Sequence, residues 1–394
     1  MQNWRTGYWF LALVLVIFLV GGCGADFLVP PRENGVSDWT VMVFLNGDND
    51  LNQAARRDLN SMEQVGSTDR VNIVVQFDSY FGGANRYLVK RDYDPYRVTS
   101  PILESLGEVN MGDPQVLSDF IRFCAREFPA EKYMLVIWNH GSGFKGATRD
   151  ISFDDTAGDA LTIPQVAEAL SSGYRYLGKK IDLLGMDACL MAMVEVAYEI
   201  KDYARVFVSS QELEPEEGWN YQALLKSLVQ NPSLGERKLA RIIVDSYIAF
   251  YPYGSVTQSA VDLGKVDALV QAVDRLSQSI LSDPLTSPAH YLKLGDSAQY
   301  FSGDWDYVDL GHLAYLLSYE PGVRSAQTKA AAQEVQEALQ EVVFHYKNQG
   351  TKVEAAQGLS IYFPWYPYNP KYESLRFARD TQWDEMLRYL ARWR

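Results

Sequence analysis

Residues 133–143 read YMLVIWNHGSG and residues 181–189 read IDLLGMDAC, and these two stretches are the most informative about the fold. In each stretch a short apolar run leads directly into a reactive side chain, His140 in the first and Cys189 in the second. Strands that are buried on both faces read as continuous apolar runs of this kind. Parallel strands end at the same edge of a sheet, and ligand sites lie beyond that edge. We therefore predict that both side chains lie there.

Similar apolar runs alternate with amphipathic stretches on either side of these two segments. The predicted strands are Trp39–Leu45, Val71–Phe77, Tyr133–Trp138, Ile181–Leu184 and Arg205–Ser209. The predicted helices between them are Asp50–Val65, Pro114–Phe128, Ile163–Leu170 and Ala188–Tyr203. Strands that alternate with helices are typical of parallel crossovers. The predicted fold class is therefore α/β, with a mostly parallel sheet and helices on both of its faces.

Beyond Ser210 the pattern is looser and mainly helical. An acidic loop, Gln211–Gly218, comes first. The elements predicted after it are helices at Tyr221–Val229, Ser233–Phe250, Val266–Ser282 and Ala326–Tyr346 and strands at Ser255–Leu263 and Gly358–Phe363. We therefore predict a main domain at 38–250 and a smaller C-terminal region at 251–394, which completes the sheet and packs helices against it.

The charge and cysteine content of the chain argue against nucleic-acid binding and against a disulfide-rich scaffold. The 394 residues include 36 Lys and Arg against 50 Asp and Glu, a formal net charge of −14, without a basic tract. Phosphate binding depends on clustered positive charge, so nucleic acid is not an expected partner. The three cysteines, Cys23, Cys124 and Cys189, lie in very different contexts, which argues against a disulfide framework. Cys124 lies on the apolar face of a predicted helix and should belong to the core.

The N-terminus carries a targeting signal. Arg5 precedes an apolar run from Tyr8 to Val20 that suits a signal peptide and is short for a spanning helix, which needs about 20 residues. The following Gly-Gly-Cys resembles the lipobox of bacterial lipoproteins. We predict a signal peptide at 1–22, a lipidated Cys23 and a flexible tether at 23–37. The lipid anchor would hold the protein at the cell membrane or outer membrane, facing outside the cytoplasm. An uncleaved anchor helix is the alternative.

The surroundings of Cys189 and His140 suit acyl transfer. In the predicted pattern Cys189 opens a helix, whose unsatisfied N–H groups and dipole would stabilise a thiolate, and a nearby imidazole can accept its proton. The glycine after His140, Gly141, leaves space for a peptide N–H to approach an oxyanion. The competing interpretations are a small buried cysteine in the core and a hydrogen-bonding histidine at a strand end.

These residues also carry a family resemblance. His140-Gly141 after one strand and Asp187-Ala188-Cys189 after a later one resemble the cysteine peptidases related to caspases, and the clostripain family in particular. The blocks that match this family, in the same order along the chain, are Trp39–Phe44, Asp48–Leu51, Trp138–Gly141, Phe153–Thr156, Ile181–Ala192 and Glu212–Trp219. The match is good over roughly residues 39–220 and loose beyond.

The resemblance implies a caspase-like fold and a cysteine endopeptidase in which His140 and Cys189 form a catalytic dyad. The N–H groups of Gly141 and Cys189 would form the oxyanion hole. Substrates would be proteins or peptides with Arg or Lys before the scissile bond. The candidates for holding that residue are Asp187, Glu217, where the family more usually has Asp, and Glu212. Self-cleavage between the histidine and cysteine blocks is also implied, with Lys145 and Arg149 as basic residues in that interval.

Several alternatives stay open at this stage. Asp187 could cap a helix instead of binding substrate, and the acidic loop could be a solvated turn. Asp48, Asn49 and Asp50 could bind a cation or begin a helix. No metal site and no required cofactor are evident from the sequence, although calcium is reported as a trait of the resembled family. The alternative to an enzyme is a surface-anchored binding protein that keeps a peptidase scaffold without turnover.

Overall fold

The computed structural model describes residues 35–145, 150–365 and 367–394, and the chain from Arg32 to Arg394 forms one compact unit. The predicted signal peptide, Cys23 and most of the predicted tether lie outside the described residues, as does Arg149. Among the residues that are described, no helix is both long and apolar enough to cross a bilayer.

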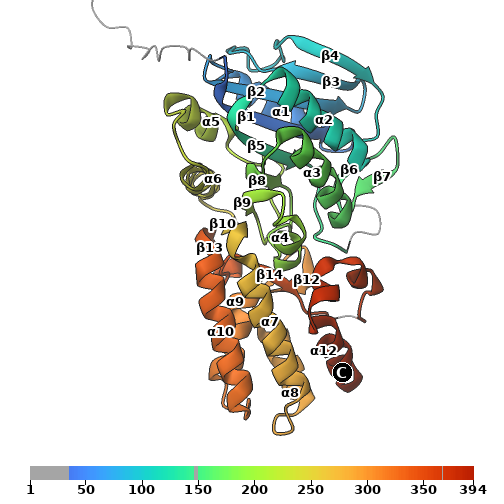
Figure 1. Cartoon of the computed structure of the whole chain (residues 1–394), viewed down its shortest axis with the longest axis vertical. Helices are drawn as coiled ribbons and strands as arrows, with labels where there is room; N and C mark the ends of the chain where they lie inside the picture. The colour runs from blue at the N-terminus through green and yellow to red at the C-terminus, as the bar shows by residue number, and fades with distance from the viewer. Residues whose placement is uncertain (1–34, 146–149, 366) are drawn as a thin grey trace, which may run out of the picture. The chain divides into compact units, whose positions relative to one another are not determined.

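A mostly parallel sheet of nine strands forms the centre of this unit (Figure 1). Its strands are, in spatial order, β13 (Val343–Gln349), β10 (Val256–Asp262), β9 (Ala204–Ser209), β8 (Ile181–Asp187), β5 (Ala130–Trp138), β1 (Ser37–Gly47), β2 (Val71–Ser79), β3 (Gly83–Leu88) and β4 (Ile102–Gly107). The five strands from β9 to β2 are parallel, and antiparallel strands extend the sheet at both edges. The five strands predicted from the sequence are the five parallel ones.

Helices cover both faces of the sheet, because alternate residues of each apolar strand face different cores. In β5, Met134 and Val136 face one core, and Leu135 and Ile137 face the other. The first face is covered by α1 (Asn52–Glu63), α5 (Tyr221–Gln230) and α6 (Glu236–Phe250). The second is covered by α2 (Pro114–Glu127), α3 (Ile163–Leu177), α4 (Val194–Ile200) and α7 (Val266–Leu281). The predicted α/β class with helices on both faces is confirmed.

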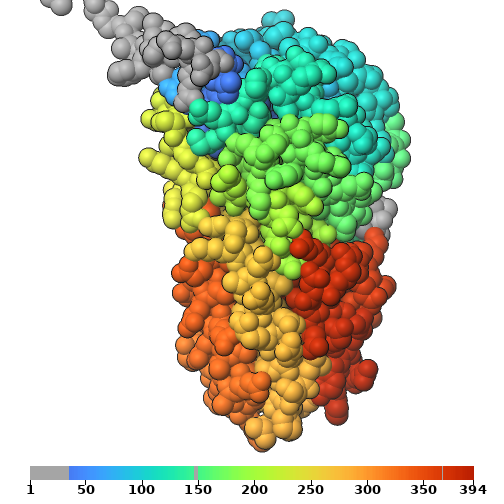
Figure 2. Space-filling model, in the orientation of Figure 1, coloured from blue at the N-terminus to red at the C-terminus, as the bar shows by residue number. Residues whose placement is uncertain are grey.

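The last third of the chain both extends the sheet and packs against it. β10 and β13 belong to the central sheet, and α10 packs between α7 and α9. The further helices are α8 (Pro288–Ser297), α9 (Leu310–Tyr319), α10 (Ala326–Val342), α11 (Arg376–Asp380) and α12 (Trp383–Leu390). The two small sheets consist of β11 (Tyr300–Phe301), β12 (Asp304–Asp309) and β14 (Ser360–Tyr362), and of β6 (Ile151–Asp154) and β7 (Asp159–Leu161). Figure 2 shows this later part directly against the middle of the chain.

Two predicted helices are partly wrong. The helix predicted at Ala188–Tyr203 begins only at Val194, because the N–H groups of Leu190 and Ala192 donate to carbonyls of the distant residues Glu212 and Ser210. The helix predicted to reach Tyr346 ends at Val342, because the residues after it pair with β10 as an antiparallel strand. In both cases long-range hydrogen bonds override a local helical pattern.

Candidate active site

The register of the sheet brings His140 and Cys189 to neighbouring positions. Trp138 at the end of β5 pairs with Asp187 at the end of β8, and each reactive residue lies two positions beyond its strand's paired residue. The N–H of Asn139 donates to the carbonyl oxygen of Asp187 at 3.3 Å, which continues the pairing past the strands. A side chain at position 141 would collide with the carbonyl oxygen of Cys189. Gly141 therefore allows the two turns to approach each other.

Cys189 lies in a tight turn and not at a helix N-terminus. The next residue, Leu190, has φ of +63°, a left-handed conformation that is uncommon for a residue with a branched side chain. The N–H of Glu214 donates to Sγ of Cys189 at 3.2 Å. Burial raises the pKa of the Cys189 thiol, the Glu214 N–H partly opposes this, and the charges of Asp187 and Glu212 add to it. Because α4 begins only at Val194, the predicted stabilisation of a Cys189 thiolate by a helix N-terminus is wrong.

His140 is held by a carboxylate. Its Nε2 lies 2.7 Å from Oδ1 of Asp50, in the turn between β1 and α1. This contact leaves Nδ1 as the ring nitrogen through which the imidazole can exchange a proton with the thiol. The sequence suggested Asp50 only as a cation ligand or helix cap, and the residue at the N-cap position of α1 is Leu51. The block Asp48–Leu51 could be recognised in the sequence after a predicted strand, but nothing in the sequence indicated that Asp50 contacts His140.

Two peptide N–H groups are available at the same point. Those of Gly141 and Cys189 donate to no other residue among those described, although their neighbours do: Ser142 N–H to Asp150 and Leu190 N–H to Glu212. Both belong to the two turns that Gly141 allows to approach. An oxyanion that forms on a carbonyl carbon beside Sγ can therefore be bound by backbone donors that need no rearrangement.

Three carboxyl groups lie on the face of the sheet that α1, α5 and α6 cover. They belong to Asp58, Asp187 and Glu214. Asp187 accepts hydrogen bonds from the N–H of Trp219 at 3.2 Å and the hydroxyl of Tyr221 at 2.8 Å. Neither carboxylate oxygen of Glu214 accepts a well-formed hydrogen bond from another described residue, and the same holds for Oδ2 of Asp58.

Within the described part of the chain, none of these three groups forms an ion pair, although the charge of Arg57 partly opposes the raised pKa of Asp58. Burial is the first cause of the raised pKa of each group; the charge of Asp187 adds to those of Glu214 and Asp58. No Lys or Arg in the described ranges forms an ion pair with any of them. A buried carboxylate without an ion-pair partner is costly in its charged form, which agrees with the raised pKa of all three groups.

The other two predicted substrate-binding residues, Glu217 and Glu212, lie outside this group of three carboxyl groups. Glu217 is exposed on the same loop, and its charge contributes to the raised pKa of Asp58 and of Tyr251. Glu212 is buried, and its carboxylate accepts from the N–H and hydroxyl of Ser302, each at 3.0 Å. The structure thus brings Asp187 together with Glu214 and Asp58, which the sequence had not suggested, and turns Glu212 toward the β11–β12 turn.

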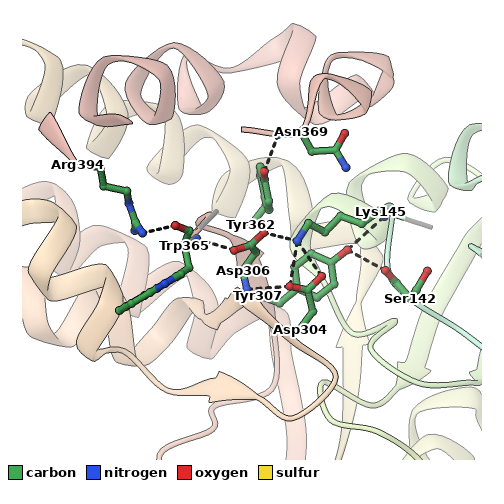
Figure 3. Close-up of polar contacts among 9 residues, drawn as sticks. All are labelled: Ser142, Lys145, Asp304, Asp306, Tyr307, Tyr362, Trp365, Asn369 and Arg394. Carbon is green, nitrogen blue, oxygen red and sulfur yellow. Dashed lines mark hydrogen bonds and ion pairs between the residues drawn. The ribbon is translucent and has the colours of Figure 1, made fainter. Parts of the chain in front are cut away.

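The segment that follows His140 is attached to the small C-terminal sheet (Figure 3). The hydroxyl of Tyr307 donates to the carbonyl oxygen of Ser142 at 2.8 Å. The ammonium group of Lys145 donates to both carboxylate oxygens of Asp304, at 2.8 and 3.0 Å, and to Asp306. It also lies over the ring of Tyr307, 5.4 Å from the centroid. We call Lys145, Asp304, Asp306 and Tyr307 the lysine clasp.

A family model described as the clostripain family matches residues 43–393 of this chain. The chain belongs to the clostripain family. Clostripain of Hathewaya histolytica is 25% identical to it over 337 residues, which cover 71% of this chain and 61% of clostripain. The chain thus spans less than two thirds of the length of that relative.

Solved structures agree with this fold. An inactive zymogen protease from Parabacteroides distasonis superposes with a TM-score of 0.69 at 18% identity, covering 90% of this chain and 99% of that one. A secreted cysteine protease from Bacteroides thetaiotaomicron, in complex with an irreversible peptide inhibitor, superposes with a TM-score of 0.66 at 21% identity and the same coverage. At these identities the likeness concerns the fold.

Proposed function

We propose that this clostripain-family chain is a cysteine endopeptidase that cleaves peptide bonds after Arg or Lys. The observation that carries the proposal is the shared edge of β5 and β8, where the turns of His140 and Cys189 meet beside the buried carboxyl groups of Asp187 and Glu214, neither of which has an ion-pair partner among the described residues. Family membership supports a thiol peptidase, and the carboxylates of Asp187 and Glu214 support a cationic side chain at P1, the residue before the scissile bond.

The residues of the site divide the reaction into two steps. His140 takes the thiol proton as Sγ of Cys189 attacks the carbonyl carbon, and the N–H groups of Gly141 and Cys189 bind the oxyanion of the tetrahedral intermediate. The imidazolium then donates its proton to the leaving amine, and a thioester on Cys189 remains. Water, deprotonated by His140, hydrolyses this thioester. Asp50 holds the imidazole and stabilises its charged form.

Fluorogenic peptides that differ only at P1, with Arg, Lys or Gln, test this proposal directly. Wild type should cleave the Arg and Lys peptides with kcat/KM at least about 100-fold above that for Gln, since a buried charge pair is worth a few kcal/mol. Cys189→Ala should lose turnover of all three peptides and keep its melting temperature. Cys124→Ala, which changes the other cysteine of the described residues, serves as the matched control. Wild-type turnover by Cys189→Ala would refute the mechanism.

We also propose that the mature protein is a lipoprotein anchored through Cys23. The support is the sequence alone, namely an apolar run from Tyr8 to Val20 followed by Gly-Gly-Cys. Diacylation together with N-acylation anchors far more firmly than one chain. Intact-mass analysis of membrane-extracted protein should show the lipid on Cys23 and the loss of residues 1–22. An unmodified Cys23 with the leader attached would exclude this route.

A further inference from the structure

The hydroxyl of Tyr307 bridges two backbone groups of the segment that follows His140 (Figure 3). It donates to the carbonyl oxygen of Ser142 at 2.8 Å and accepts from the N–H of Lys145 at 3.3 Å. Tyr307 belongs to β12 and is fully buried. Burial raises the pKa of Tyr307 well above its usual value, so the hydroxyl remains a donor. One phenol from the C-terminal part of the chain therefore holds both ends of the turn 142–145.

This turn packs closely around the phenol. Gly143 has φ of +63°, and a Cβ at that position would lie 2.7 Å from the hydroxyl oxygen of Tyr307. The ring centroid of Phe144 lies 5.9 Å from that of Tyr307, and the ammonium group of Lys145 lies over the same ring. The residues of the turn thus all lie against Tyr307.

The strand that carries Tyr307 is itself held on both sides. The carboxylate of Asp306 accepts from the ammonium group of Lys145 and, at 2.6 Å, from the N–H of Trp365. Tyr307 pairs with Tyr362 of β14 in the small antiparallel sheet. β12 is therefore a fixed support, and the Tyr307 hydroxyl resists any displacement of the turn.

The turn continues directly from a donor of the proposed oxyanion hole. Gly141, whose N–H would bind the oxyanion, immediately precedes Ser142. A glycine adopts many backbone conformations at little cost, so the direction of its N–H depends on what fixes the residues beside it. The N–H of Ser142 donates to the carbonyl oxygen of Asp150 at 3.0 Å, and its carbonyl oxygen accepts from Tyr307. The bond from Tyr307 comes from a side chain, so a substitution can remove it alone.

We propose that Tyr307 is a positioning residue for catalysis, which keeps the N–H of Gly141 directed at the oxyanion. The inference rests on the proposed function, because the oxyanion hole is part of it. Tyr307 is buried and acts through Ser142 and Gly141 instead of on the substrate. A donor lowers the barrier most when it is aligned before the charge forms, and small misplacements are costly. The C-terminal part of the chain thereby contributes to the reaction as well as to packing.

Tyr307→Phe keeps the ring and removes the hydroxyl, and it tests this role. With an Arg fluorogenic peptide its kcat should fall at least about tenfold and its KM should change less than about twofold, because a misdirected donor weakens binding of the transition state more than binding of the substrate. Tyr362→Phe is the matched control. Its hydroxyl lies in the same aromatic cluster and accepts from the N–H of Asn369 at 2.9 Å, so this variant should keep the wild-type kcat.

Two reagents separate the oxyanion turn from the dyad. A peptide aldehyde ending in Arg adds to Sγ of Cys189 as a hemithioacetal, whose oxygen lies where the oxyanion forms. Iodoacetamide alkylates the same sulfur with loss of iodide and forms no oxyanion. Tyr307→Phe should bind the aldehyde at least about tenfold more weakly and react with iodoacetamide at the wild-type rate. An equal loss toward both reagents, or wild-type kcat and aldehyde affinity, would overturn the role of Tyr307.

A second variant covers the case in which Tyr307→Phe does not fold, as judged by its melting temperature. In Gly143→Ala the added Cβ displaces the hydroxyl while the phenol is retained, so kcat and aldehyde affinity should fall together and the iodoacetamide rate should stay at the wild-type value. Wild-type values for all three would overturn the proposal. A wild-type chain that neither cleaves the Arg peptide nor binds the aldehyde would instead refute the proposed function, and this inference with it.

Discussion

At the scale of single residues, the site combines one thiol, one imidazole and carboxylates in two roles. Asp50 is largely exposed, with 66% of its side chain accessible, and it contacts His140. The carboxyl groups of Asp187 and Glu214 are shielded from solvent and lie within hydrogen-bonding reach of each other. The exposed Asp50 and the buried Asp187 and Glu214 thus have the different surroundings that their proposed roles require, which are to orient His140 and to bind a cationic P1 side chain.

Asp50→Asn should lower kcat about tenfold and leave KM nearly unchanged. The carboxylate favours the tautomer with the proton on Nε2, which leaves Nδ1 able to accept the thiol proton, and it stabilises the imidazolium, whereas an amide does neither reliably. The effect is modest because Asp50 is solvated. Steady-state kinetics and the pH profile of kcat measure it, and Asp155→Asn, an exposed acid in a nearby turn, is the control. An unchanged kcat and pH profile would show that the contact is incidental.

Glu214→Gln and Asp187→Asn should each reduce kcat/KM for Arg peptides by about 100-fold and for Gln peptides little. Burial raises the pKa of both carboxyls, so the fraction of them that is charged, and able to pair with a guanidinium, grows as pH rises. The Arg-to-Gln ratio of kcat/KM should therefore rise with pH in wild type and rise less in Glu214→Gln. If Asp187 only supported Trp219 and Tyr221, its variant would lose stability and keep the ratio.

At the scale of elements, the turn after β5 is attached at both of its described ends. Gly141 packs on the Cys189 turn, and the lysine clasp joins the same segment to β12. The side chain of Lys145 is 17% exposed and that of Asp306 is 2% exposed. Removing one member of such a buried pair leaves the other without a partner and can cost about 3 kcal/mol. The clasp therefore stabilises the segment that carries His140.

Self-cleavage between the two catalytic blocks should occur after Arg149 in preference to Lys145. The clasp must open before the Lys145 ammonium can enter a substrate pocket. Intact-mass analysis of wild type after long incubation identifies the cut, with Cys189→Ala as the control for contaminating proteases. Lys145→Gln should still be cut after Arg149. A single cut after Lys145, or an uncut wild-type chain, would contradict this prediction.

At the scale of the whole molecule, buried acids outside the active site make the free energy of unfolding depend on pH. Glu195 in α4 is fully buried, and Oε1 accepts from the N–H of Tyr362 and the hydroxyl of Tyr372. Burial raises its pKa to about 7, and burial likewise raises that of Asp309 to about 6. Glu195 joins α4 to β14 of the small sheet, and Asp309 is the last residue of β12. Ionisation of either acid should therefore weaken the packing of the C-terminal part.

The free energy of unfolding should fall as pH rises from about 5 to about 8. A carboxyl whose pKa is raised by folding keeps its proton in the folded state, so its contribution is full below the unfolded pKa and is lost as pH passes the folded value. For Glu195 the loss is on the order of 3 kcal/mol. Urea titrations at several pH values should show a flatter dependence for Glu195→Gln. Identical slopes in wild type and the variant would refute the assignment to Glu195.

The parallel core and the order of the blocks along it could be predicted from local sequence patterns. Continuous apolar runs can be buried on both faces only with helices on each side, so the five central strands and the helices between them followed from local pattern. The neighbouring positions of His140 and Cys189 followed as well, because both come directly after parallel strands. Family membership was likewise expected from the blocks between Trp39 and Trp219.

The surroundings of these residues, in contrast, depend on the packing of segments that are distant in the sequence. The Cys189 turn replaces a predicted helical start because Leu190 and Ala192 donate to residues of another loop, which no local pattern records. Asp50, Glu214 and Asp58 acquire their roles from partners far away in sequence, and a buried carboxylate has the same letter as a solvated one. Burial and the neighbours of a carboxylate arise when distant segments pack, and they set the pKa and so the chemistry of Asp58, Asp187 and Glu214.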